Sequence, residues 1–108
     1  MHLIKSIIRP DKIEAVKDAL SSLGVSGMTV TEVRGHGLQK GRTAIYRGRE
    51  YQITLLPKIQ IECVLEDHLV EPAIEAVIKA ARTGEIGDGR VFVTPVLQSY
   101  RIRTGERE

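Results

Sequence analysis

The sequence is short of several features that would point to particular classes of protein. It has a single cysteine, Cys63, which excludes an internal disulfide and fits a reducing compartment. Apolar runs fall short of the roughly 18 residues that a membrane helix needs. The first residues, MHLIKSIIRPDK, meet charge too early for a signal peptide. The net charge of +2 is too small for a broad nucleic-acid-binding surface. We therefore expect a single cytoplasmic domain over residues 1–108.

Groups suited to catalysis are also scarce. His2, His36 and His68 stand in unrelated contexts, and their spacing with one another and with Cys63 is not that of metal ligands. We expect His36 and His68 to be exposed, and Cys63 to be a buried thiol in the middle of a strand. The sequence therefore predicts no catalytic residue, and we expect a protein that is not an enzyme.

Two segments have the apolar spacing of amphipathic helices. The first begins near Pro10 and ends at Gly24. The second begins at Asp67, a plausible cap, contains Pro72 near its first turn, and closes at Gly84. The apolar positions are Ile13, Val16, Leu20 and Leu23 in the first segment, and Val70, Ile74, Val77, Ile78 and Ala81 in the second.

Stretches rich in Val, Ile and Thr flank these helices and predict strands. They are Leu3–Ile8, Met28–Val33, Ile59–Leu65 and Arg90–Val96, with a shorter stretch at Ser99–Arg103. Strand, helix, strand thus occurs twice. This order predicts an α+β fold, the ferredoxin-like double βαβ, with an antiparallel sheet and both helices on one face. The uncovered face would still be largely apolar, which favours self-association.

The longest stretch without periodicity is Gly35–Lys58, between the two halves. Loops of this length in a compact domain are commonly functional. This one is rich in glycine, arginine and lysine and contains Tyr46 and Tyr51, which is typical of a contact element. The alternative is a hairpin that extends the neighbouring strands and has a solvated tip.

Two further segments could bind an anion. Gly84, Gly87 and Gly89 lie between the second helix and the last strand, where successive amides can form an anion-binding nest. A plain helix-to-strand turn is the alternative. Arg101 and Arg103 would share one side of a short strand, which suits a phosphate or, alternatively, a solvated edge.

At these segments the sequence resembles the PII family of nitrogen-regulatory signal proteins, from about residue 1 to Arg107. The stretch TGEIGDGRVFVTPV looks like the C-terminal signature of that family, and YRGREY looks like its modified-tyrosine motif. GMTVTEVRGHGLQKG, LLPKIQIE and RIRTGE are similar to further characteristic stretches, in the same order. The resemblance implies a homotrimer with nucleotide sites between subunits and a long flexible loop, here about residues 37–55.

The resemblance also implies ligands and residues for them. ATP and ADP would compete for one site, and 2-oxoglutarate would bind beside Mg-ATP. The adenine would lie near Ile7, Thr29, Glu62 and Val64. The phosphates would meet Gly87, Asp88, Gly89 and Arg90, together with Arg101 and Arg103 of a neighbouring chain. The Mg²⁺ and 2-oxoglutarate would involve Gln39 and Lys58, near the backbone of Gly37, Lys40 and Gly41.

In the family the loop docks on partners such as an ammonium transporter or enzymes of nitrogen metabolism. Tyr51 corresponds to a tyrosine that is modified in some members. Three positions depart from the common pattern. Leu38 replaces an arginine and removes one phosphate contact, and Arg90 replaces a frequent lysine. Arg49 excludes serine phosphorylation at its position and weakens the case for modification of Tyr51.

Other functions remain as alternatives at this point. One is a PII-like regulator that binds adenine nucleotides without sensing 2-oxoglutarate. A second is an enzyme acting on ATP, although the sequence shows no positioned base. A third is an RNA-binding module, which would need aromatic side chains on the open sheet face. The four main predicted strands contain one aromatic residue, Phe92, so we expect no nucleic-acid partner.

Overall fold

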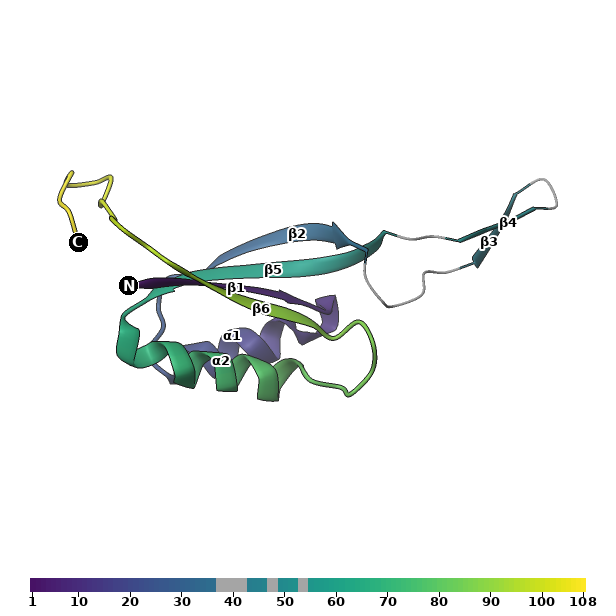
Figure 1. Ribbon diagram of the computed structural model, residues 1–108, viewed down its shortest axis with the longest axis horizontal. Helices are drawn as coiled ribbons and strands as arrows, with labels where there is room; N and C mark the ends of the chain where they lie inside the picture. Colours follow the sequence, from purple (N-terminus) through teal and green to yellow (C-terminus); the bar gives the residue numbers. More distant parts are fainter. Residues whose placement is uncertain (37–42, 47–48, 53–54) are drawn as a thin grey trace.

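The computed structural model describes residues 1–36, 43–46, 49–52 and 55–108. Its elements alternate as the sequence predicts (Figure 1). Pro10 opens a short 3₁₀ helix that leads directly into the first α-helix, because its fixed φ suits a helix start. The main elements are β1 (His2–Ile8), η1 (Pro10–Lys12), α1 (Ile13–Ser22), β2 (Thr29–Gly35), β5 (Leu56–Leu65), α2 (Asp67–Ala81) and β6 (Gly89–Pro95).

Four of the strands form one antiparallel sheet in the order β2-β5-β1-β6. Figure 1 shows α1 and α2 side by side on one face of this sheet. The prediction of an α+β, ferredoxin-like architecture is confirmed. The two central strands come from opposite halves of the chain, so β1 and β5 bring residues about 60 positions apart into register.

The core lies between the helices and the sheet. Side chains alternate between the two faces of a strand, so every second residue of β5 from Ile59 to Leu65 points to the helices and is buried. Val16 and Leu20 of α1 and Val77 of α2 close the core from the other side. Cys63 is buried in it, as predicted. This packing fixes which side chains are left on the open face of the sheet.

The segment between β2 and β5 contains secondary structure that periodicity did not predict. Residues Thr43–Tyr46 (β3) and Arg49–Gln52 (β4) pair as an antiparallel hairpin. The hairpin forms a sheet of its own instead of lengthening the main strands. The hairpin alternative is therefore confirmed in part. β5 also begins at Leu56, earlier than predicted, and pairs there with Gly35 at the end of β2.

The predicted cap of the second helix is wrong. Glu66 occupies the N-cap position of α2, and Asp67 is the first helical residue. The Asp67 carboxylate instead accepts a hydrogen bond from the Met1 amino group at 2.9 Å and contacts His2 Nδ1 at 2.8 Å. Pro72 lies inside the helix, beyond its first turn. Among the described residues, no helix is long and apolar enough to span a membrane.

The short strand predicted at Ser99–Arg103 is wrong as well. The chain turns back on itself after Tyr100, which forms an isolated bridge with Arg107. Gly105 has a φ of 72°, which suits glycine, and its amide donates to the Arg101 carbonyl at 2.7 Å. Arg101 and Arg103 thus belong to a turn, and the alternating geometry expected of a strand does not apply to them.

Candidate functional site

The open face of the sheet carries the residues assigned to an adenine. Ile7 of β1 alternates with the buried Ile8, and Glu62 and Val64 of β5 alternate with the buried Ile61 and Cys63. They therefore point away from the helices. Thr29 lies opposite Glu62 in the β2–β5 register and shares that face. Glu62 accepts a hydrogen bond from Gln60 Nε2 at 2.9 Å, on the same face.

The start of β6 approaches the end of β1 so closely that only glycine fits. Gly89 pairs with Ile8 and has a φ of 106°. A Cβ at this position would lie 1.7 Å from the Ile7 carbonyl oxygen. Gly89 therefore lets the loop before β6 meet the sheet directly, beside an open-face residue of the candidate site.

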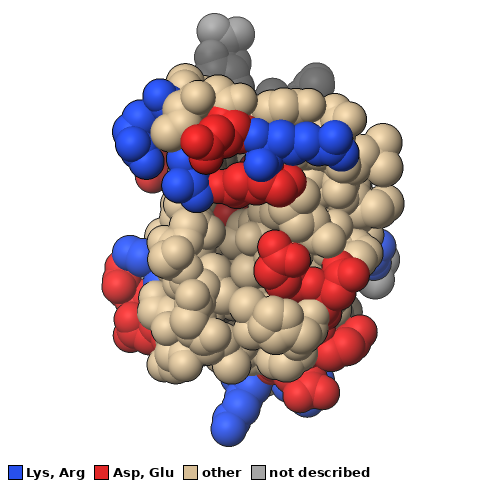
Figure 2. Space-filling view, turned by 90° about the vertical axis from the view of Figure 1, so that its left-hand side faces the viewer, with Lys and Arg blue, Asp and Glu red and all other residues tan. Residues whose placement is uncertain are grey.

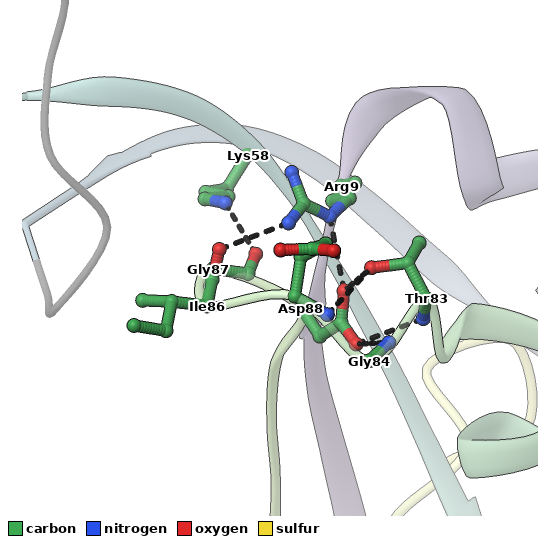
Figure 3. Close-up of polar contacts among 8 residues, drawn as sticks. Arg9, Lys58, Thr83, Gly84, Ile86, Gly87 and Asp88 are labelled. Atoms are coloured by element: carbon green, nitrogen blue, oxygen red, sulfur yellow. Dashed lines mark hydrogen bonds and ion pairs between the residues drawn. The ribbon is translucent and has the colours of Figure 1, made fainter.

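The loop between α2 and β6 is organised around the Asp88 carboxylate (Figure 3). This carboxylate accepts hydrogen bonds from the backbone amides of Thr83 and Gly84 at 2.8 and 2.9 Å, and from the Thr83 hydroxyl. Arg9 Nε donates to it at 3.1 Å. The Thr83 bonds, then those of Gly84 and Arg9, hold the pKa of the Asp88 carboxyl far below its usual range. Asp88 is thus a charged anchor inside its own loop.

This arrangement corrects the simple anion nest expected from the glycines. The Gly84 amide points to Asp88, so the loop supplies its own anion there. The loop residues that remain to face a ligand on the open side of the sheet are Ile86, Gly87, Gly89 and Arg90. Arg90 is exposed, and the register places it opposite Ile7 on the open face.

Lys58 joins the open face to this loop. Its Nζ donates a hydrogen bond to the Gly87 carbonyl at 2.7 Å. Partial burial, followed by the nearby Arg9 guanidinium, lowers the pKa of the Lys58 ammonium, while Asp88 acts in the opposite direction. The Lys58 ammonium and the Arg9 guanidinium thus both lie near the Asp88 carboxylate.

A cavity of about 460 Å³ opens at this corner of the sheet. It brings together five of the predicted ligand residues. Its lining also includes His36 and the apolar side chains of Leu56, Ile86 and Phe92. The predicted residues that line it are Ile7, Lys58, Gly87, Gly89 and Arg90. A cavity with two cations and several apolar walls suits an anion that carries an apolar group.

A second cavity, of about 350 Å³, lies on the helix side of β6. Apolar residues of α2 and β6 make most of its wall, with Arg82, Asp88 and Arg90 at one end. We place the candidate site in the open-face cavity because Lys58 and Gly87 line that cavity.

The predicted arginine pair lies elsewhere in the chain. β6 runs from Gly89 beside Ile8 to Pro95 beside His2, so the residues that follow leave from the far end of the sheet (Figure 1). Arg101 forms an ion pair with Glu108 there. Figure 2 looks onto this end and shows basic and acidic side chains lying against one another in its upper part. One chain does not bring Arg101 and Arg103 to the cavity.

The remaining predicted residues belong to the segment between β2 and β5. Gly37, Gln39, Lys40 and Gly41 lie outside the described residues. Tyr51 lies in β4, opposite Ala44. Within the described part of the chain, no group of three or more His, Cys, Asp or Glu side chains could hold a metal ion.

Sequence reasoning missed Arg9, which binds the loop at two points. A signal for it exists in the register. Once β1 and β6 are paired with Ile8 opposite Gly89, the next residues along, Arg9 and Asp88, must also be neighbours. Predicted strands of correct length are therefore enough to suggest this ion pair.

Comparison with known proteins gives one consistent answer. A family model described as nitrogen regulatory protein P-II matches residues 1–106. A protein of that name from Azospirillum brasilense is 57% identical over 107 residues, which cover 99% of this chain and 96% of the relative. Proteins with the same name from Cereibacter sphaeroides and Haemophilus influenzae are 54% and 53% identical, and each alignment covers 98% of this chain and 95% of the relative. The chain therefore belongs to the nitrogen regulatory protein P-II family.

Proposed function

We propose that this chain is a cytoplasmic signal-transduction regulator of nitrogen metabolism that responds to ATP and ADP, and that it acts by binding rather than by catalysis. The observation that carries the proposal is the open-face cavity, where Lys58 and Arg90 meet the Gly87–Gly89 turn. This cavity lies where β2 ends and β5 begins, so a ligand in it would contact Gly35, His36 and Leu56, the residues that flank segment 37–55. Which ligand is bound would in this way affect the binding of a target protein to segment 37–55.

The nucleotide would bind across the open face. Its phosphates would lie at Gly87, Gly89 and Arg90, where guanidinium groups give strong charge-assisted hydrogen bonds. Its adenine would lie on the open face of the sheet, against Ile7 of β1 and against Glu62 and Val64 of β5. Arg101 and Arg103 lie at the far end of the same chain, so a neighbouring copy would have to supply them. The assembly that we propose is a homotrimer.

Magnesium and 2-oxoglutarate would follow the nucleotide. Asp88 already accepts four hydrogen bonds from Thr83, Gly84 and Arg9, so its oxygens are poor candidates for metal ligands. The nucleotide phosphates would therefore carry the Mg²⁺, with Gln39 as the protein ligand. Lys58 would meet the distal carboxylate of 2-oxoglutarate. The effectors would be coupled, because the keto acid needs the metal that ATP brings.

One observation favours the alternative of a nucleotide regulator that does not sense 2-oxoglutarate. Lys58 Nζ is hydrogen-bonded to the Gly87 carbonyl at 2.7 Å, so one of its three donors is already used and a carboxylate ligand would have to bind beside that contact. Under either alternative, segment 37–55 would be the surface offered to a partner, an ammonium transporter or an enzyme of nitrogen metabolism.

Calorimetric titration of ATP, ADP and 2-oxoglutarate, with and without Mg²⁺, tests the proposal. We expect saturable binding of both nucleotides, and 2-oxoglutarate binding only in the presence of Mg-ATP. Nucleotide binding without any response to 2-oxoglutarate would select the alternative. Absence of nucleotide binding would contradict both, and continuous heat from ATP turnover would favour an enzyme.

A further inference from the structure

We propose that Arg9 is a positioning residue for the ligand-binding loop, which it clamps at the two residues on either side of Gly87. The proposal rests on the proposed nucleotide function of that loop. Arg9 follows β1 directly and lies at the corner where β1, β5 and β6 meet the loop (Figure 3).

The clamp consists of two hydrogen bonds from one guanidinium. Arg9 Nε donates to Asp88 Oδ1 at 3.1 Å, and Arg9 Nη2 donates to the Ile86 carbonyl oxygen at 3.0 Å. The side chains of Arg9 and Asp88 are 21% and 24% exposed. Both are therefore partly buried, which strengthens the ion pair relative to one on the open surface.

Gly87 is the residue that most needs such support. Its φ of 100° is open to glycine alone among common residues, and glycine has the greatest conformational freedom in the chain. Arg9 holds the Ile86–Gly87 peptide directly through the Ile86 carbonyl, and it holds the Asp88 side chain, so the loop is tied to Arg9 on both sides of Gly87. The Gly87 carbonyl then points to Lys58. The position of the turn relative to Lys58 thus depends on Arg9.

Arg9 also neutralises the charge that would oppose an anionic ligand. The Asp88 carboxylate lies one residue from Gly87 and from Gly89, where the phosphates are proposed to bind. Unpaired, it would repel them. Paired with Arg9 and bound by the amides of Thr83 and Gly84, it stabilises the loop without presenting an uncompensated charge.

The geometry requires arginine and not merely a positive charge. A guanidinium has separate donors in one rigid plane, and these reach a carboxylate and a carbonyl at the same time. A lysine ammonium is a single point charge on a flexible stem. If Arg9 acted only through its charge, lysine would replace it. If it acts as a clamp, lysine would not.

The test compares Arg9→Lys, Arg9→Gln and the control Lys79→Gln by ATP titration of the full chain. Lys79 is exposed on α2, and its replacement by glutamine removes the same charge. We expect both Arg9 variants to lose about tenfold in ATP affinity and the control to match the parent. Parent-like affinity in Arg9→Lys, or in Arg9→Gln, would overturn the clamp.

Two further measurements test the Arg9 clamp even if Arg9→Gln folds poorly. Part of the Arg9 clamp acts through Asp88, so Arg9→Gln should cost less ATP affinity in an Asp88→Asn background than in the parent; full additivity would contradict the proposal. Amide exchange without nucleotide should be faster at Thr83 and Gly84 in Arg9→Lys than in the parent. If the parent binds no ATP, the proposed function fails, and unchanged exchange would then separately refute the clamp.

Discussion

At the scale of single residues, two constraints require glycine at position 89, and mutations can separate their effects on stability. A side chain there would clash with the Ile7 carbonyl oxygen, and the residue would also have to adopt a φ that is unfavourable for any residue other than glycine. Gly24 has a similar φ of 88°, but a Cβ added to it would meet nothing within 4 Å. We expect Gly24→Ala to cost about 1 kcal/mol of unfolding free energy, and Gly89→Ala to cost clearly more, about 3 kcal/mol. Denaturant unfolding measures both. Equal losses would show that the close approach to Ile7 is unimportant.

The Asp88 carboxyl makes a pH-dependent contribution whose sign follows from its lowered pKa. Its pKa in the folded chain lies below the ordinary value of 3.8. Its contribution is therefore complete above that value and is lost as the pH falls through the folded pKa. At pH 7 the parent should have a higher unfolding free energy than Asp88→Asn, and this gap should narrow steadily below about pH 4. A gap that stays constant down to pH 2 would contradict the hydrogen-bonding role.

Lys58 should separate the two proposed effectors. Lys58→Met removes the cation that would meet the distal carboxylate of 2-oxoglutarate but leaves Arg90 for the phosphates. We expect 2-oxoglutarate binding to be lost and ATP affinity to change by less than about threefold. Because the Lys58 pKa is lowered, 2-oxoglutarate affinity in the parent should also fall with rising pH before 10.5 is reached. Unchanged 2-oxoglutarate binding in Lys58→Met would exclude this residue from the site.

At the scale of elements, two adjacent residues of α2 lie on different faces of the helix, one buried and one partly exposed. Val77 is 1% exposed and Ile78 is 38% exposed. Val77→Ala leaves a cavity against the sheet, so we expect a loss of about 2 kcal/mol in unfolding free energy. Ile78→Ala removes more atoms but should cost less than about 1 kcal/mol. Thermal or denaturant unfolding of the two variants decides the order, and the reverse order would mean that α2 packs differently.

The elements that can be predicted from the sequence are those that bury a regular apolar pattern. Strands β1, β2, β5 and β6 and both helices fall within a few residues of their predicted bounds. The β3–β4 hairpin is predicted only as an alternative, because its backbone pairing leaves no regular apolar pattern. The turn after Tyr100 escapes prediction since its reversal depends on backbone bonds, among them Arg101 to Glu106 at 2.8 Å, which side-chain patterns do not encode.

The candidate site is predictable in part for a related reason. Face alternation places Ile7, Glu62 and Val64 on one surface once the strands are known. The role of Asp88 does not follow from glycine spacing, because the Thr83 and Gly84 amides could equally have faced a ligand. Arg9 depends on strand register across 79 positions. Such a contact is visible only when the paired strands are aligned residue by residue.

At the scale of the whole molecule, the proposed phosphate ligands occupy opposite ends of the sheet. Arg90 follows Gly89 at the Ile8 end, whereas Arg101 and Arg103 follow the strand beyond the His2 end (Figure 1). Within one copy they could not bind the same nucleotide. A shared site thus needs more than one copy. For the proposed homotrimer, light scattering should give three copies of the 12.0 kDa chain, and a monomer at micromolar concentration would remove the composite site.

Mixed assemblies test the composite site directly. Arg90→Ala damages the loop half of each site, and Arg101→Ala/Arg103→Ala damages the other half, so each variant alone should bind ATP at least about tenfold more weakly. Refolded together in equal amounts, the two chains should form some sites with an intact loop from one chain and intact arginines from the other. Random assembly makes about a quarter of the interfaces complete, so a tight-binding fraction of that size should reappear. If both halves came from one chain, mixing would restore no tight sites, because every chain would carry a damaged half. Separately refolded variants, mixed without exchange of subunits, provide the control.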